Sequence, residues 1–303
     1  MTELTLRQLE MFCTVARLGS FTRAAEAGNV GQPAVSQHVA ALERLLGVPL
    51  VVRVGRGVRL TEAGQLVADY GARIVRLTQQ LHEGIGGLKG LATGRLVVGA
   101  GQTPGDYILP AMLGAFQRQY PGISIELEIA DTRRVVEWLL RHTYDLGFIG
   151  DRVEHPDLAL EPFVEDRVVL FTAPRHPLTR RREVALAEVI AAGLIVREPG
   201  SATRATGERA LRAAGLEPRF AMELGSNEAV KRAVLAGLGV GLLSRYALEV
   251  EARAGLLSVL PVPAFEGRRW LYIARNREAP LTSAQVAFLT MARQLAAGTS
   301  ARR

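Results

Sequence analysis

Residues 20–47, SFTRAAEAGNVGQPAVSQHVAALERLLG, hold the pattern that decides the fold of the first sixty residues. Ser20 is a good N-cap for a short helix, which a turn at Gly28 ends. A second helix begins at Gln32-Pro33, because proline is tolerated in the first turn of a helix, and it ends at Gly47. Two short helices joined by a tight turn predict a helix-turn-helix.

Apolar residues at helical spacing supply a core around this motif. Upstream, they predict a helix that Gly19 ends, and its apolar face is Leu6, Leu9, Cys13 and Ala16. The second helix of the motif has the stripe Val35, Val39, Leu42 and Leu46, and in the first helix Ala24 and Ala25 are small enough for close crossing. Cys13 is the only cysteine, which excludes an intramolecular disulfide or a thiolate zinc finger, so we expect it in the core.

The other face of the second helix is polar and uncharged at its start. Gln32, Ser36 and Gln37 are hydrogen-bonding side chains suited to base edges and phosphates in the DNA major groove. An ordinary solvated polar face would have the same residues, because helical periodicity carries no information about DNA.

A short β-pattern follows Pro49. Two apolar runs flank Gly55-Arg56-Gly57, and this predicts a hairpin, or wing. Arg53 and Arg56 could bind phosphates or enter the minor groove, although a surface hairpin with solvated arginines fits equally.

Thr61-Glu62-Ala63-Gly64 is a capping sequence that opens a long helix with a seven-residue repeat. Its two apolar series are Ala63, Tyr70 and Leu77, and Val67, Ile74, Leu81 and Leu88. About three such heptads can pair two chains, and helix-turn-helix proteins commonly bind DNA as symmetric dimers. The helix is expected to fade into a flexible hinge at Gly84, Gly86, Gly87 and Gly90.

From Arg95 onward, strand-like runs alternate with helical ones, which predicts parallel α/β sheets. The strand-like runs are 96–100, 123–129, 146–149, 168–172, 194–196 and 240–243. The helical segments are 107–119, 133–141, 203–214, 226–237 and 282–296. The roughly 210 residues involved are enough for two lobes.

Two loops in this region resemble anion-binding sites. Gly200-Ser201-Ala202-Thr203 precedes a helical segment, and Gln102-Thr103 lies between a strand and the next helix. A helix N-terminus offers unpaired N–H groups and partial positive charge, and the carboxyl ends of parallel strands are the usual ligand edge. A small oxyanion or carboxylate fits best, although serines and threonines before helices are mostly caps.

Composition is that of an ordinary soluble protein, with 48% hydrophobic and 22% charged residues among 303. No segment has the roughly 20 consecutive apolar residues of a membrane span, and residues 1–8 do not read as a secretory signal. We therefore expect a cytoplasmic protein that does not contact the membrane. The net charge of +7 suits a polyanionic partner but is weak evidence alone.

Five elements over about sixty residues resemble the signature of LysR-type transcription regulators. They are Leu6-Arg7-Gln8-Leu9, Ser20-Phe21-Thr22-Arg23-Ala24-Ala25, Gln32-Pro33-Ala34-Val35-Ser36, Leu42-Glu43 and Leu60-Thr61-Glu62-Ala63-Gly64. Downstream motifs are similar to a subgroup with regulators of sulfur assimilation and of carbon fixation. These motifs are Tyr107-Ile108-Leu109-Pro110, Asp145-Leu146-Gly147, Arg197-Glu198-Pro199-Gly200-Ser201, Glu223-Leu224-Gly225-Ser226 and Ala236-Gly237-Leu238-Gly239-Val240-Gly241.

The resemblance implies a multidomain α/β protein with three parts: a winged helix-turn-helix (1–61), a dimerisation helix with hinge (62–91) and an effector-binding domain (92–303). That domain would have two lobes, as in periplasmic binding proteins, with lobe 1 at 92–164 and 267–303 and lobe 2 at 165–266. The implied partners are promoter DNA with dyad symmetry, a small effector such as sulfite, sulfate or another oxyanion, and further copies of the chain in a dimer or tetramer. No cofactor or metal is implied.

The resemblance also extends both sets of site residues. The DNA-binding set becomes Arg23, Gln32, Pro33, Ser36, Gln37, Arg53 and Arg56. The effector-binding set becomes Gln102, Thr103, Gly150, Gly200, Ser201, Thr203 and Ser226. Two departures from the family pattern are Val51, where the wing usually has phenylalanine, and the run Gly101-Gln102-Thr103-Pro104, which keeps only one of the usual hydroxyl residues. The second departure suggests a different ligand.

An enzyme and a solute-binding protein are the rival classes. His142, Asp145, Asp151, His155 and Asp157 are of the metal-ligand types, but their spacing fits no known motif. Ser201 lacks the Gly-x-Ser-x-Gly context of a nucleophile. The helix-turn-helix pattern, together with the lack of a signal-like N-terminus, argues against a periplasmic solute binder.

Overall fold

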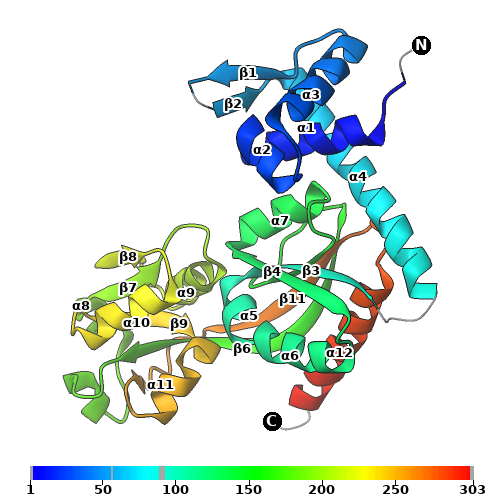
Figure 1. Cartoon of the computed structure of the whole chain (residues 1–303). Coiled ribbons are helices and arrows are strands. Elements are labelled where there is room, and N and C mark those ends of the chain that lie inside the picture. Colours follow the sequence, from blue (N-terminus) through cyan, green and yellow to red (C-terminus); the bar gives the residue numbers. More distant parts are fainter. Residues whose placement is uncertain (1–2, 56, 89–92, 301–303) are drawn as a thin grey trace. The chain divides into compact units, whose positions relative to one another are not determined.

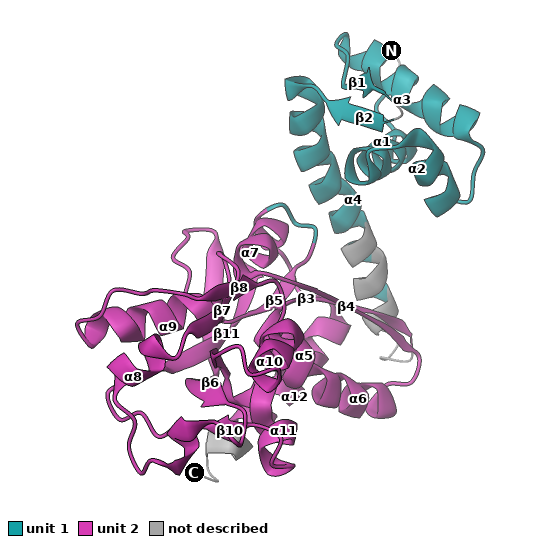
Figure 2. Ribbon diagram, turned by 90° about the vertical axis from the view of Figure 1, so that its left-hand side faces the viewer, with its two compact units in different colours: residues 1–88, 141–143 teal, residues 89–140, 144–303 magenta. Residues whose placement is uncertain are grey.

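The computed structural model describes residues 3–55, 57–88 and 93–300. Residues 1–88 with 141–143 form one compact unit, and residues 89–140 with 144–303 form a second. Figure 2 colours these as unit 1 and unit 2. None of the described helices is both long and apolar enough to cross a membrane.

Unit 1 is a three-helix motif followed by a hairpin and a long helix (Figure 1). Its elements are α1 (Leu6–Leu18), α2 (Phe21–Ala27), α3 (Gln32–Leu46), β1 (Val51–Val54), β2 (Gly57–Leu60) and α4 (Glu62–Leu88). The predicted caps are confirmed, since the Ser20 hydroxyl accepts from the Arg23 N–H and Gly19 ends α1 in the left-handed conformation. The predicted hairpin is also confirmed, with β1 antiparallel to β2.

Helix α4 begins inside the core of unit 1. A Cβ on Gly64 would lie 1.9 Å from the carbonyl oxygen of Leu50, and one on Gly71 would lie 2.9 Å from Cys13 Sγ. Glycine at these two positions therefore lets α4 lie directly against the base of the hairpin and against α1. Ala63 and Val67, expected in the dimer stripe, are instead partly buried against this core.

Two further expectations for unit 1 are wrong. Helix α4 does not fade at Gly84, Gly86 and Gly87, because it continues to Leu88; Gly90 lies outside the described residues. Leu46 is 42% exposed and is not part of the core, whereas Val35, Val39 and Leu42 are buried as expected.

Unit 2 is an α/β structure with one continuous sheet in the order β4-β3-β5-β11-β6-β9-β7-β8, and β10 pairs with β6. Its strands are β3 (Gly94–Gly101), β4 (Ile123–Ala130), β5 (Leu146–Ile149), β6 (Leu158–Thr172), β7 (Leu194–Arg197), β8 (Met222–Leu224), β9 (Val240–Ser244), β10 (Ser258–Val259) and β11 (Arg268–Asn276). Its α-helices are α5 (Gln102–Tyr107), α6 (Leu109–Gln119), α7 (Thr132–Leu140), α8 (Leu186–Ala191), α9 (Ala202–Ala213), α10 (Asn227–Leu235), α11 (Glu249–Arg253) and α12 (Ser283–Ser300). Two 3-10 turns are η1 (Pro177–Arg180) and η2 (Arg245–Leu248).

The sheet is not wholly parallel, contrary to expectation. Strands β6 and β11 run antiparallel to their neighbours, while β3, β4 and β5 are parallel to one another, as are β7, β8 and β9. The first part of β6 pairs with β11 as far as Arg167, and from Val168 onward β6 pairs with β9. These two long strands join the halves of unit 2, here called the first lobe (β3, β4, β5, β11) and the second lobe (β7, β8, β9).

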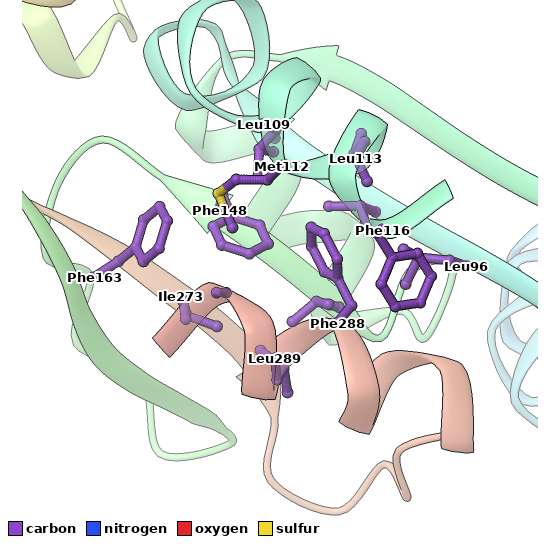
Figure 3. Packing of buried hydrophobic residues seen from close by; sticks show 14 of the residues in the cluster. Leu96, Leu109, Met112, Leu113, Phe116, Phe148, Phe163, Ile273, Phe288 and Leu289 are labelled. Atoms are coloured by element: carbon purple, nitrogen blue, oxygen red, sulfur yellow. The ribbon is translucent and has the colours of Figure 1, made fainter. Parts of the chain in front are cut away.

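Each lobe has helices on both faces of its part of the sheet. In the first lobe, α6 and α12 cover one face, where Phe116, Phe148 and Phe288 make edge-to-face contacts (Figure 3). Helix α7 covers the other face through Val135, Trp138 and Leu139. In the second lobe, α8 and α9 lie on one face and α10 on the other. The helices on both faces thereby hold the strands of each lobe in place.

Candidate functional site

A small cavity lies between the lobes where several strands end. The loops after β3, β4, β5 and β7 all contribute to it, and Arg269 reaches it from β11. Its lining is Gly101, Gln102, Thr103, Pro104, Ala130, Asp131, Thr132, Gly150, Arg197, Ser201, Ala202, Thr203 and Arg269. The carboxyl ends of parallel strands are the usual ligand edge of such sheets. We call this the inner cavity.

Arg269 is the central cation of the inner cavity. Its Nε donates to Asp166 Oδ2 at 2.8 Å, and its Nη2 donates to the hydroxyls of Thr103 and Thr203 at 3.2 and 3.1 Å. Its Nη1 is buried and has no hydrogen-bond partner. Because a buried unpaired donor is costly, this N–H group is the strongest indication of a ligand acceptor at the site.

The buried pair of Arg269 and Asp166 is held in one orientation. Asp166 also accepts from the Ser244 hydroxyl at 2.7 Å and from the Arg167 N–H at 2.7 Å. Asp166 holds the guanidinium from one side, since its Oδ2 lies 2.8 Å from both Nε and Nη2 of Arg269. The site therefore has the polarity that an anion requires.

Thr103 and Thr203 stand on opposite lobes, at the starts of α5 and α9. Their hydroxyl oxygens are 3.4 Å apart, and both residues are 4% exposed. Gly150 makes the neighbouring contact, because a Cβ there would lie 2.9 Å from the Cβ of Ala202. The lobes are thus in direct contact across the inner cavity.

The inner cavity is narrow in this conformation. Its volume is about 20 Å³, which is room for roughly one water molecule. On the rim, Asp151 of the first lobe accepts from both Nη atoms of Arg209 of the second lobe, at 2.7 and 3.2 Å. Any ligand larger than a water therefore requires these lobe contacts to separate.

Arg197, a second buried arginine in the lining, is already engaged. Its guanidinium donates to Glu198 through Nε at 2.7 Å and to Asn227 Oδ1 through Nη1 at 2.7 Å. Glu198 balances its charge, so of these two arginines only Arg269 has a buried donor without a partner.

The predicted effector residues fall into three groups. Gln102, Thr103, Gly150, Ser201 and Thr203 all line the inner cavity. Gly200 lines an adjoining cavity instead. Ser226 lines neither, because its hydroxyl caps α10 by accepting from the Ala229 N–H at 3.1 Å.

Arg269 and Arg197 were missed as site residues. Arg197 belongs to the motif Arg197-Glu198-Pro199-Gly200-Ser201, but nothing in that motif indicates that its side chain is buried. Arg269 begins a strand in which residues 269, 271 and 273 are buried. An arginine on the buried face of an alternating strand is a signal that the sequence contains, but the strand itself was not predicted.

The predicted DNA-binding residues lie on the surface of unit 1. Gln32, Pro33 and Gln37 are exposed at the start of α3, and Gln32 donates to the Ser36 hydroxyl at 2.9 Å. Arg23 on α2 and Arg53 on β1 are also exposed. Arg56 lies outside the described residues. Ala24 and Ala25 are buried, as expected for a close crossing of α2 and α3.

The alternative metal site has no counterpart in the described ranges, where no group of three His, Cys, Asp or Glu side chains is placed to hold an ion. His155 faces Asp157, with Nδ1 3.7 Å from Oδ2. Asp145 lies at 1% exposure before β5.

Two family profiles match the chain. One, described as LysR substrate binding domain, matches residues 89–297, and the other, described as bacterial regulatory helix-turn-helix protein of the lysR family, matches residues 6–65.

Three individual proteins are similar over long stretches. The transcriptional activator CmpR of Synechocystis is 39% identical, over 95% of each chain. The RuBisCO operon transcriptional regulator of Allochromatium vinosum is 35% identical, over 94% of each. The regulatory domain of CcmR from Synechocystis, solved in complex with 2-PG, is 27% identical with a TM-score of 0.62, over 67% of this chain and 98% of that one.

Proposed function

The chain belongs to the LysR family of DNA-binding transcription regulators, and we propose that it senses a small anion in the inner cavity and changes its binding to promoter DNA in response. One observation carries the effector part of this proposal: Arg269, whose buried Nη1 has no hydrogen-bond partner, lines a cavity between two lobes. A cation that is already desolvated and oriented favours an anionic acceptor.

The proposed ligand contacts are Gln102, Thr103, Gly150, Ser201, Thr203 and the newly identified Arg269. The threonine hydroxyls can donate to an oxyanion, and the start of α9 adds N–H groups that have no partner within the helix. Of the predicted set, Gly200 belongs to the adjoining cavity, and Ser226 would act only indirectly through α10. The related CcmR domain holds 2-phosphoglycolate, itself a small anion, so phosphate and carboxylate join sulfate and sulfite as candidate groups.

For unit 1, we propose that Gln32, Pro33, Ser36 and Gln37 face base edges in the major groove, while Arg23, Arg53 and Arg56 contact phosphates. We also propose the domain boundaries that the resemblance implies. The DNA-binding domain ends at residue 61 and the linker helix with its hinge at residue 91, and the second lobe comprises residues 165–266. One of the relatives is named for the RuBisCO operon, and we propose that the targets of this chain include genes of carbon fixation. Such a regulator would act without catalysis, in the cytoplasm, as a dimer or tetramer.

Gel-shift binding to the DNA upstream of its own gene, across a range of salt concentrations, tests the DNA-binding part. We expect a specific shift whose affinity falls with salt, because phosphate contacts release counterions. Gln32→Ala should weaken binding to the specific site by about 1–3 kcal/mol and leave non-specific binding unchanged.

Equal losses on both DNAs would reassign Gln32 to a phosphate contact. Glu26→Gln, an exposed change on α2, serves as the control and should bind as the wild type does. If no specific shift is seen on that DNA or on sites selected from the genome, the regulator proposal fails.

A further inference from the structure

A second cavity, of about 300 Å³, adjoins the inner cavity at the rim of the cleft. The two share Thr132, Ser201 and Ala202 in their linings. Its size is at the lower end of small-molecule sites, so it has the room that the inner cavity lacks. We call it the outer cavity.

Both carboxylates in the outer lining are already neutralised. Asp151 accepts two hydrogen bonds from Arg209, and Glu208 pairs with Arg204 and Arg212 at 2.7 and 3.4 Å. Arg204 is likewise engaged, since it also pairs with Glu223 at 2.8 Å.

Two arginines of the first lobe keep most of their donors available. Within the described residues, Arg133 forms one long ion pair, with Nε 4.0 Å from Oδ1 of Asp131, and its side chain is 73% exposed. Arg152 pairs with Glu154 at 3.5 Å, with both side chains well exposed, and such pairs contribute little. The two guanidinium groups at the outer cavity are therefore only weakly paired and can donate to a ligand.

At the mouth of the outer cavity, the guanidinium of Arg133 lies beside Gly200 of the opposite lobe. Gly200 has φ +96°, and a Cβ there would lie 2.6 Å from Nη2 of Arg133. Only glycine allows the guanidinium to lie this close to the backbone that leads into α9. The first residues of this twelve-residue helix line the same cavity as Arg133, and a helix N-terminus adds partial positive charge.

We propose that the outer cavity is a second anion subsite, formed by Arg133 and Arg152, and that the effector is a short molecule with an acidic group at each end. One group binds Arg269, Thr103 and Thr203 in the inner cavity once the lobes separate, and the other remains at the mouth. This inference rests on the proposed function, because it assumes that the inner cavity binds an anion. A phosphorylated hydroxy acid has the required chemistry, whereas sulfate fills only one subsite.

Calorimetric titration of the full chain at constant ionic strength tests this, with sulfate and 2-phosphoglycolate as probes. Arg133→Gln should weaken 2-phosphoglycolate binding about tenfold, the effect of one lost charge-assisted hydrogen bond, and leave sulfate binding unchanged. Arg134→Gln is the matched control on the same helix, because Arg134 pairs with Glu137 at 3.0 Å and lies over Trp138, so it should bind both probes as the wild type does.

Unchanged binding of 2-phosphoglycolate by Arg133→Gln, with sulfate still bound, would overturn the outer subsite and leave the proposed function intact. Equal loss of both probes would overturn it too, since it would mean that Arg133 only supports the cleft. If the wild type binds neither probe, the anion-sensing function fails and this inference fails with it.

Discussion

Arg269 carries a buried positive charge whose hydrogen bonding is incomplete. Asp166 compensates the charge, but the free Nη1 leaves part of the desolvation cost of the guanidinium unrecovered. An anion that supplies the missing acceptor gains an interaction without a further cost of burying the arginine. Substituting Arg269 itself would be a poor test, because Asp166 would remain buried without its cation, at about 3–5 kcal/mol.

Cys13 offers a residue-scale test of the core of unit 1. Burial raises the pKa of its thiol to about 11, so at pH 8 the thiolate fraction is roughly one in a thousand, about a hundredfold below that of an exposed cysteine. We predict that iodoacetamide alkylates Cys13 about a hundredfold more slowly in the native protein than in urea. Because the thiolate is the reactive form, the native rate should rise about tenfold per pH unit towards pH 11.

Mass spectrometry of timed samples measures both rates directly, since Cys13 is the only cysteine. A native rate close to that in urea would mean that α1 and α4 do not pack around Gly71 as described.

At this scale the sequence predicted the threonines of the cleft but not its arginines. Ser201 caps α9, and Thr103 and Thr203 lie in the first turns of α5 and α9; that local pattern is visible without the fold. Arg269 and Arg197 depend on burial and on partners far away in the sequence, such as Asp166 and Thr103, which lie 103 and 166 residues from Arg269, and no local pattern reveals these. Ser226 shows the limit of the local pattern, because it has the same cap chemistry as Ser201 but lies at another strand end.

Helix α4 has an apolar stripe that unit 1 does not cover. Six large apolar side chains at spacings of three and four residues are between 41% and 61% exposed, namely Leu66, Tyr70, Ile74, Leu77, Leu81 and Ile85. This spacing is that of a helix that pairs with another helix, and the family forms oligomers. Tyr70, Ile74, Leu77 and Leu81 are exposed, as the heptad prediction requires, whereas Ala63 and Val67 pack into unit 1. Pairing of two chains through this helix stays a prediction.

We predict that Leu77→Asp, at the middle of this stripe, reduces the chain to a monomer and weakens specific DNA binding. In a dimer the introduced carboxylate would be buried without a partner, which opposes association. In the monomer it stays in water at no such cost. Light scattering after size-exclusion chromatography measures the mass, and Gln65→Glu, an exposed change on the same helix, should keep the mass of the wild type. A wild-type mass for Leu77→Asp would contradict pairing through α4.

Strands β8, β10 and β11 were not predicted from the sequence, and β6 was predicted only in part. The prediction covered the last third of β6, because Glu161, Pro162 and Glu165 interrupt the apolar run before it. There the strand is paired with β11, and the register shifts beside Pro162, where a missing N–H is tolerated. The antiparallel pairing of these strands comes from the way the chain crosses between lobes, which alternation of β and α segments does not encode.

At the scale of unit 2, both lobes contribute residues to the lining of the inner cavity, where we propose that an anion binds. Thr103 and Thr203 meet on Arg269, Gly150 meets Ala202, and Asp151 pairs with Arg209. A ligand that occupies the inner cavity must replace these contacts with its own, so it favours a different spacing of the lobes. By linkage, an effector that prefers one arrangement shifts its population, and DNA shifts the same equilibrium in return.

Thr203→Val distinguishes the loss of a ligand contact from general damage to the fold. It removes one hydroxyl from the inner cavity at nearly constant volume, so anion affinity should fall while the lobes still fold. Thr172→Val is the matched control, because Thr172 is 1% exposed in the second lobe, its hydroxyl has no partner, and it lines neither cavity.

The most direct test of the central claim is the affinity of the full chain for the DNA upstream of its own gene, titrated with 2-phosphoglycolate at constant ionic strength. We predict a change in DNA affinity of about fivefold or more in the wild type and in Thr172→Val, the usual range for allosteric coupling. In Thr203→Val the same change should need about tenfold more 2-phosphoglycolate. An effect of equal size at equal concentration in all three proteins, or no effect of any small oxyanion in the wild type, would contradict an effector site between the lobes.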